Sequence, residues 1–264
     1  MSPLASRLLV AALGLPLVLG ALWAGGWWLF ALVVAGALLA LHEFFAITKP
    51  LRPIPLAGYA GLVGVLCAMQ DGDLVWTLGA VLGTLALAFL LKGLAATQGS
   101  ATVSVGVTVL GTAWVGLGLG FVLGLRDLPE YGLVASLAVL LAIFADDTAA
   151  YFGGRALGRH KLAPAISPGK TWEGFVFGTL AAVFVVFVAL YQDREEFLTI
   201  GQSLLLGVVV ALAGPLGDLF ESMVKRDLGV KDSGRLLAGH GGVLDRIDAI
   251  LFAFPAAFLT VYAF

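Results

Sequence analysis

Long runs of apolar residues, separated by short groups of charged residues or prolines, extend along the whole of this chain. A helix needs about 20 apolar residues to cross the hydrocarbon core of a bilayer, and most of the runs have that length. The pattern therefore predicts nine membrane-spanning helices. Their expected bounds are 8–24, 27–47, 56–70, 73–91, 103–125, 131–152, 173–191, 200–219 and 243–262.

The composition supports an all-α, polytopic membrane protein. Of the 264 residues, 60% are hydrophobic and 12% are charged, whereas about 25% are charged in a typical soluble domain. Nine helices leave too few residues for a separate soluble domain, so the active site is expected in the membrane or at its surface. The net charge of −2 argues against bulk binding of nucleic acid, and a single cysteine, Cys67, excludes an intrachain disulfide.

The distribution of Lys and Arg predicts the orientation of the chain in the membrane. Of the 15 basic residues, 13 fall at the N-terminus or in loops that follow even-numbered helices, and only Arg126 and Arg194 fall on the other side. The positive-inside rule then places the N-terminus in the cytoplasm. We expect an integral protein of the inner, or cytoplasmic, membrane of the cell, with its active site facing the cytoplasm.

A repeat of small residues occurs in the fifth predicted helix. Gly116, Gly120 and Gly124 are four positions apart, a spacing that lets two helix backbones approach closely. We favour packing within one molecule over a dimer interface, so a homodimer remains an alternative.

Two connections are long enough to hold chemistry, and both are predicted to be cytoplasmic. The chain accordingly divides into residues 1–100, with about four helices, and residues 101–264, with about five. The second part contains the expected catalytic loops, 146–174 and 218–248. The active site is thus expected at the cytoplasmic side of the C-terminal half.

Several acids lie at the ends of the predicted helices that border these loops. An ionised side chain within a membrane segment is costly, so its presence indicates a function. They are Asp146, Asp147, Asp218, Asp245 and Asp248. Carboxylates beside cations suit a hard divalent ion such as Mg²⁺ and a phosphate ligand. Helical spacing places Asp218, Ser222 and Lys225 on one face of the eighth helix. For Asp146 and Asp147, a structural cap or an ion pair with Arg155 is the alternative.

The segment Ile166–Gly174 is read as a turn followed by a helix start, with Glu173 in the first turn. A helix N-terminus near Lys170 could bind an anion, although an ordinary cytoplasmic turn is an equal alternative. A Walker A loop is excluded because Pro164 stands where that loop requires glycine. Glu43, near the end of the second helix, is read as an interfacial anchor or a helix-to-helix hydrogen bond rather than as a catalytic group.

The last loop carries polar residues at fixed spacings across 27 positions, 222–248. They lie in the segments Ser222–Arg226, Lys231–Gly234 and Gly239–Asp248. This arrangement resembles the signature of the phosphatidate cytidylyltransferases, or CDP-diacylglycerol synthases. Segments 147–155 and 167–174 are similar to that family too, whereas the N-terminal half agrees only in being membrane-spanning. Ala238 departs from the family, which often has proline nearby, but this change removes no ligand.

The resemblance implies the reaction of CTP with phosphatidate to give CDP-diacylglycerol and pyrophosphate, with Mg²⁺ as cofactor and a second cation left open. In-line attack of the lipid phosphate on the α-phosphorus would depend on positioning and charge neutralisation. The expected metal ligands are Asp218, Asp245 and Asp248. The expected catalytic residues are Lys225, Arg226, Lys231, Asp232, His240 and Arg246. The expected substrate-binding residues are Ser222, Lys170, Gly241, Gly242 and Asp147.

Other functions compete with this interpretation. The basic residues of the last loop could merely contact anionic lipid head groups, but the acids interleaved with them favour catalysis. The sequence hardly distinguishes a phosphatidate cytidylyltransferase from a cytidylyltransferase that acts on another lipid phosphate. A membrane transporter would also use intramembrane acids, but it predicts acids near mid-membrane and two similar halves, whereas these acids cluster at the predicted cytoplasmic boundary.

Overall fold

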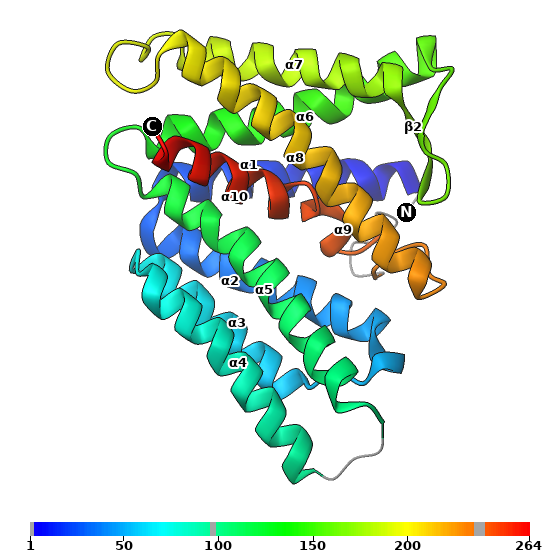
Figure 1. Cartoon of the computed structure of the whole chain (residues 1–264). Coiled ribbons are helices and arrows are strands. Elements are labelled where there is room, and N and C mark those ends of the chain that lie inside the picture. Colours follow the sequence, from blue (N-terminus) through cyan, green and yellow to red (C-terminus); the bar gives the residue numbers. More distant parts are fainter. Residues whose placement is uncertain (1–2, 96–98, 235–240) are drawn as a thin grey trace. The chain divides into compact units, whose positions relative to one another are not determined.

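The computed structural model describes residues 3–95, 99–234 and 241–264, with side chains from residue 12 onward. Within these ranges the chain is mainly helical (Figure 1). The helices are α1 (Pro3–Ala24), α2 (Gly26–Ile47), α3 (Pro55–Gln70), α4 (Leu74–Leu94), α5 (Ala101–Arg126), α6 (Gly132–Leu157), α7 (Trp172–Leu190), α8 (Ile200–Asp227), α9 (Leu244–Ile247) and α10 (Ile250–Tyr262). The short elements are a 3₁₀ helix, η1 (Lys49–Leu51), and two strands, β1 (Lys161–Ala163) and β2 (Ser167–Thr171).

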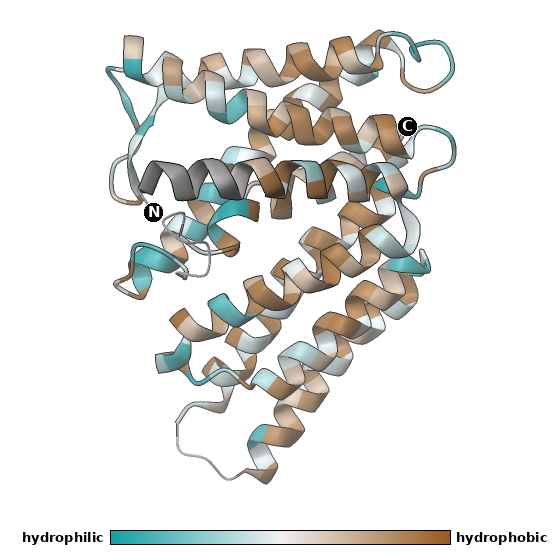
Figure 2. Cartoon of the chain, turned by 180° about the vertical axis from the view of Figure 1, so that it is seen from behind, coloured by the Kyte–Doolittle hydropathy of each residue, from teal (hydrophilic) through white to brown (hydrophobic). Residues whose placement is uncertain are grey.

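The first eight predicted helices are present as α1 to α8, and α6 and α8 extend past their predicted ends. Six of the described helices, α2 and α4 to α8, are long and apolar enough to cross a membrane. Hydrophobic residues cover most of the length of the long helices, and hydrophilic residues gather in the loops and at helix ends (Figure 2). The chain is therefore a mainly helical membrane protein, and nine crossings stay a prediction.

The ninth predicted helix, 243–262, is wrong as a single element, because it is divided into α9 and α10. Asp248 lies at the division, and its Oδ1 accepts a hydrogen bond of 2.8 Å from the main-chain N–H of Ala249. This local bond competes with the helical hydrogen-bond pattern. Asp245 and Asp248 consequently do not share one regular helix.

The β1–β2 hairpin precedes α7 and was not expected. Its strands are antiparallel, with Lys161 opposite Thr171. Thr171 then caps α7, because its Oγ1 accepts a hydrogen bond of 3.1 Å from the N–H of Gly174. The predicted helix start is confirmed, with Glu173 in the first turn. Lys170 lies on β2, one residue before the cap.

The chain folds into two compact units. The first consists of residues 1–124 and 227–247, and the second of residues 125–226 and 248–264. Each unit is a set of residues that pack against one another. The predicted division into residues 1–100 and a catalytic part, 101–264, concerns function, and it stays a prediction.

Glycines set the close packing of helices in the first unit. A side chain on Gly116 would press against Leu62, and one on Gly120 would collide with Met69, so α5 lies close against α3. The packing predicted for this glycine repeat within one molecule is thereby confirmed at these two positions. A homodimer remains the alternative that the sequence left open.

The second unit contains α6, the hairpin, α7, α8 and α10. Helices α6 and α7 pack along each other, and a side chain on Gly153 would collide with Phe177. A side chain on Gly207 would similarly collide with Val183, so α8 packs against α7. Farther along α8, Gly217 faces the main-chain carbonyl of Asp248, which brings the start of the C-terminal segment against this helix.

Candidate active site

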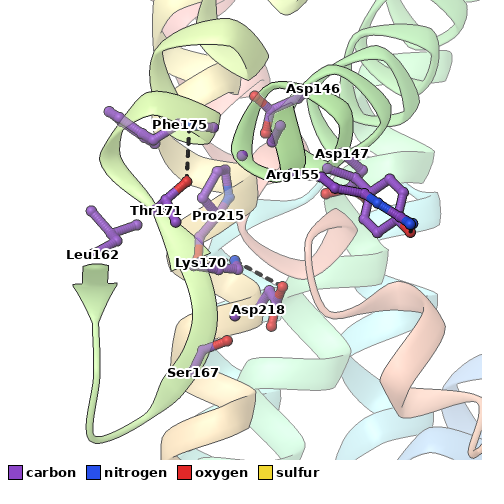
Figure 3. Close-up of a pocket in the computed structure, with 15 residues that line it drawn as sticks. Asp146, Asp147, Arg155, Leu162, Ser167, Lys170, Thr171, Phe175, Pro215 and Asp218 are labelled. Atoms are coloured by element: carbon purple, nitrogen blue, oxygen red, sulfur yellow. Dashed lines mark hydrogen bonds and ion pairs between the residues drawn. The ribbon is translucent and has the colours of Figure 1, made fainter. Parts of the chain in front are cut away.

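A cavity of about 450 Å³ lies within the second unit (Figure 3). This volume falls in the range of about 300–1,000 Å³ that is usual for small-molecule sites. Its charged and polar lining residues are Asp146, Asp147, Arg155, Ser167, Lys170, Thr171 and Asp218, and small or apolar residues such as Phe175 complete the wall. Three predicted site residues, Asp147, Lys170 and Asp218, therefore line one cavity.

An ion pair between Lys170 and Asp218 joins the hairpin to α8 at this cavity. Lys170 Nζ lies 2.8 Å from Asp218 Oδ2 and donates a longer hydrogen bond, 3.4 Å, to the carbonyl oxygen of Pro215. The other oxygen, Asp218 Oδ1, accepts a hydrogen bond of 3.3 Å from Ser222 Oγ. Figure 3 shows Lys170 reaching from its strand to Asp218. Both side chains remain partly exposed, at 25% and 35%, so a ligand can reach them.

Two adjacent acids on α6 complete the polar part of the cavity. Asp146 is buried, and its Oδ1 lies against Gly178 of α7, where no larger residue would fit. Within the described chain this oxygen has no hydrogen-bond partner. Asp147 is exposed and lies within electrostatic range of both Asp218 and Lys170. The alternative ion pair with Arg155 is not found among the described contacts, where the Arg155 guanidinium donates to the Tyr151 hydroxyl, 3.0 Å away.

The C-terminal turns of α8 hold a second ion pair, which the sequence analysis missed. Lys225 Nζ lies 2.6 Å from Glu221 Oε2, and both side chains are almost completely buried. Lys225 was predicted to share a helix face with Asp218 and Ser222. Ser222 does contact Asp218, whereas Lys225 pairs with Glu221. Only the spacing of four positions between Glu221 and Lys225 could have indicated this pair.

Arg226 follows Lys225 directly in the sequence, and Asp248 interacts with both members of this ion pair. Arg226 is exposed, and its Nε donates a long hydrogen bond, 3.5 Å, to the carbonyl oxygen of Ile166 in the hairpin turn. The Asp248 carboxyl shares a side-chain hydrogen bond with Glu221 and interacts electrostatically with Asp218 and Lys225. Arg226 and Asp248 are thus in the same unit as the cavity.

The remaining predicted residues belong to the first unit. Lys231, Asp232 and Arg246 are exposed there. The carboxylate of Asp245 accepts hydrogen bonds from two main-chain N–H groups, those of Ser233 (3.1 Å) and Gly242 (2.7 Å).

Two predicted glycines adjoin Asp245, and His240 lies outside the described residues. Gly241 has φ +81°, a conformation that favours glycine, and a side chain there would collide with the Asp245 carboxylate. A side chain on Gly242 would collide with Ser233 and Glu43. The two glycines therefore let the chain fold closely around carboxylates, and their predicted contact with substrate stays a prediction.

Glu43 on α2 was expected to be an interfacial anchor or to make a helix-to-helix hydrogen bond. It is 2% exposed, so the anchor is wrong, whereas the hydrogen bond is confirmed, because the carboxylate accepts from the N–H of Leu244, the first residue of α9. It also accepts hydrogen bonds from Ser233 and Val243. The sequence offered one signal, an acid within an apolar helix, but the partners are about 200 positions away along the chain.

Carboxylate oxygens are the donors that Mg²⁺ prefers, and neighbouring Asp218 and Asp248 fit that chemistry. Asp245 instead uses its carboxylate to bind main-chain N–H groups. Among the residues that the structure describes, no group of three His, Cys, Asp or Glu side chains has the arrangement of a metal site. The three-residue metal site therefore stays a prediction.

The chain belongs to the cytidylyltransferase family, whose sequence profile matches residues 5–264. It is accordingly an enzyme of the nucleotidyltransferase class. It is 35% identical to the phosphatidate cytidylyltransferase of Staphylococcus haemolyticus over 255 residues, which cover 94% of this chain and 95% of that protein.

Two further phosphatidate cytidylyltransferases match a shorter part of the chain. The protein of Bacillus subtilis is 38% identical over 162 residues, which cover 61% of this chain and 59% of that protein. The protein of Haemophilus influenzae is 45% identical over 130 residues, which cover 48% of this chain and 45% of that protein.

Proposed function

We propose that this chain transfers the cytidylyl group of CTP to phosphatidate, giving CDP-diacylglycerol and pyrophosphate for phospholipid biosynthesis. The observation that carries the proposal is the similarity, along nearly the whole of both chains, to a relative named for this activity. The cavity of the second unit supports it, because acids, a lysine and apolar side chains line one space. Such a lining suits substrates with both phosphate and hydrocarbon parts.

The proposed reaction joins two anions. A phosphate oxygen of phosphatidate bonds to the α-phosphorus of CTP, while the bond from that phosphorus to the oxygen bridging the β-phosphate breaks and pyrophosphate leaves with the electron pair. Because the phosphate of phosphatidate is already ionised near neutral pH, the step requires no strong general base. His240 is accordingly proposed as a hydrogen-bond donor. Alignment and charge neutralisation are then the main tasks of the protein.

Cationic side chains at the cavity are suited to neutralising the charge of the phosphate groups. Lys170 presents its ammonium group beside the acids, and Arg155 offers a planar guanidinium that can bind phosphate through two parallel hydrogen bonds. Arg226 is proposed to contact substrate phosphate as well. We keep Lys231, Asp232 and Arg246 of the first unit as proposed contributors, on the basis of the family resemblance.

Mg²⁺ is the proposed cofactor. Asp218 and Asp248 of the second unit would hold it, and Asp245 stays the third proposed ligand. When bound, the ion would neutralise charge on phosphate oxygens. Asp147 and Ser222 adjoin Asp218 and are proposed to orient the substrate. Asp218 is already paired with Lys170, so this acid serves to hold a cationic group in the cavity.

The site is proposed to face the cytoplasm. This orientation rests on the excess of Lys and Arg in the loops after even-numbered helices. The β1–β2 hairpin, which carries Lys170, lies in one of these loops. CTP would then enter from the aqueous side, whereas phosphatidate would arrive from the bilayer.

The proposal is tested with the purified chain in detergent and CTP radiolabelled at the α-phosphate. With phosphatidate and Mg²⁺, label should appear in a lipid that migrates as CDP-diacylglycerol, and Asp218→Asn should abolish it. Asp193→Asn, an acid in the loop after α7, is the matched control. Transfer to a different lipid phosphate in place of phosphatidate would correct the substrate, and failure to bind CTP would overturn the nucleotidyltransferase function.

A further inference from the structure

The first unit contains a buried carboxylate that no step of the proposed reaction uses. Glu43 is 2% exposed and lies near the end of α2, an otherwise apolar helix. Its Oε1 accepts a hydrogen bond of 3.0 Å from the main-chain N–H of Val243. Its Oε2 accepts two more, of 2.9 Å from the N–H of Leu244 and 3.2 Å from Ser233 Oγ. An acid of the N-terminal half thus binds the C-terminal sequence motif directly.

These contacts compensate for the burial of the charge. Removing an ionised carboxylate from water is costly unless hydrogen bonds or a counter-charge replace the lost solvent. In the described part of the chain, Glu43 makes no ion pair, and the three hydrogen bonds from the motif take that role. A carboxylate has four acceptor sites and no donor, so it suits a position on which only donors converge.

The motif is shaped to receive this side chain. A Cβ atom on Gly234 or on Gly242 would collide with the Glu43 carboxylate, so both glycines leave room for it. They flank positions 235–240, which lie outside the described residues. The same acid therefore holds the main chain on both sides of this interval.

Asp245 binds the same two stretches of the chain. Its carboxylate accepts the main-chain N–H groups of Ser233 and Gly242, whereas Glu43 takes the Ser233 hydroxyl and the N–H of Val243, the residue after Gly242. Ser233 is held at its amide by one acid and at its side chain by the other. Two carboxylates thus fix the same short lengths of backbone.

We infer that Glu43 is a positioning residue for cytidylyl transfer, which acts by fixing the C-terminal motif and does not touch substrate. It sets the backbone next to Asp232 and Asp245. The inference rests on the proposed function and extends it to the N-terminal half, for which the sequence indicated only membrane-spanning helices. Misplacing a group in an active site by about 1 Å can cost about 100-fold in rate.

Glu43→Gln is the first test, because an amide keeps the size of the side chain but offers only one acceptor oxygen and adds a competing donor. In the assay with CTP and phosphatidate we expect kcat to fall by about tenfold or more, with the KM for CTP changed by less than about threefold, since groups that act in the transition state are displaced. Glu43→Asp, which keeps the charge but is shorter, should retain an intermediate kcat.

Phe44→Leu is the matched control for stability. Phe44 is the next residue on α2, it is completely buried, and its ring packs edge-to-face against Trp114 of α5. This variant should lower the thermal unfolding temperature while keeping kcat near the wild-type value. If both variants lose kcat in proportion to their loss of unfolding temperature, Glu43 is merely structural and the inference is overturned.

Ser233→Ala tests the same contact from the motif side, and it decides the question if Glu43→Gln does not fold. It removes one hydroxyl donor from the buried carboxylate, so both kcat, by a few-fold, and the unfolding temperature should fall, whereas Phe44→Leu should lower the unfolding temperature alone. With both variants folded, their effects on kcat should be non-additive, as expected for residues in contact. Wild-type kcat in Ser233→Ala, or additive effects, would overturn the inference alone. A wild-type chain that transfers no cytidylyl group would overturn the proposed function and the inference together.

Discussion

Lys170 Nζ lies 2.8 Å from Asp218 Oδ2, and this ion pair joins β2 to α8 at the cavity of the second unit. Lys170 was predicted to bind an anionic substrate and Asp218 to bind a metal ion, and the structure brings the two together. Because the two opposite charges are adjacent, a phosphate group that enters the cavity could bind Lys170, and its counter-cation could bind Asp218. The pair therefore defines the part of the cavity where charge neutralisation is expected.

Replacing Lys170 by Met should lower kcat/KM for CTP by about 100-fold, the usual cost of removing one preorganised charge from a site that stabilises developing charge. The unfolding temperature should change little, because the ion pair with Asp218 is partly exposed and such pairs contribute at most about 1 kcal/mol. Lys161→Met, on the paired strand, is the control. Equal activities of the two variants would show that Lys170 has no role in the reaction.

A second prediction concerns Gly217 of α8. Gly217→Ala should lower the free energy of unfolding by about 1–3 kcal/mol, because the new methyl group would collide with the main-chain carbonyl of Asp248. Gly214→Ala, one turn earlier, meets only Ala249 Cβ at 3.9 Å and should be neutral or stabilising by about 0.5–1 kcal/mol. Thermal unfolding of the two variants in the same detergent compares them. Equal unfolding temperatures would contradict the close approach at Gly217.

The long helices could be predicted from the sequence because a membrane span requires a continuous apolar run of defined length. The β1–β2 hairpin could not, because its strands have three and five residues and carry no alternating pattern. The division at Asp248 was missed for a different reason. It depends on the side chain of Asp248 and on the packing of its backbone against Gly217, which hydropathy does not report.

Three residues of the cavity could be predicted from the sequence, whereas the ion pair between two of them could not. Asp147, Lys170 and Asp218 were identified from local motifs, and they line one cavity. The pairing of Lys170 with Asp218 was not predicted, since it depends on a hairpin with no sequence signal. A helix-to-helix hydrogen bond was one of two expectations for Glu43, but its partners could not be predicted, because Ser233 lies 190 positions away and a single sequence carries no information about such a contact.

The buried pair of Glu221 and Lys225 leads to a third prediction. Lys225→Met should destabilise the protein by about 3–5 kcal/mol, because it removes the counter-charge of the buried Glu221 carboxylate. The double variant Glu221→Gln with Lys225→Met should regain most of that stability. Thermal unfolding of the two variants measures the recovery, and an equally unstable double variant would contradict it. Activity of the recovered double variant would then separate a structural role of Lys225 from phosphate binding.

Removal of divalent cations gives a fourth prediction. Excess EDTA should abolish cytidylyl transfer, and added Mg²⁺ should restore it, because two negatively charged substrates must approach each other. Asp218→Glu, which keeps the charge but moves it by one methylene group, should raise the Mg²⁺ concentration needed for half-maximal rate. Asp193→Glu should leave that concentration unchanged. Full activity in EDTA would remove Mg²⁺ from the proposed mechanism.

The orientation of the chain can be tested because Cys67 is its only cysteine. In a Cys67→Ser background, Arg159→Cys adds one thiol just before the β1–β2 hairpin, and Glu195→Cys adds one in the loop after α7. A maleimide that cannot cross membranes should label Arg159→Cys only in inside-out vesicles and Glu195→Cys only in right-side-out vesicles, as the positive-inside rule predicts. The reverse pattern would place the Lys170 hairpin outside the cell, away from cytoplasmic CTP. Labelling of both thiols from one side would instead require an even number of crossings between them.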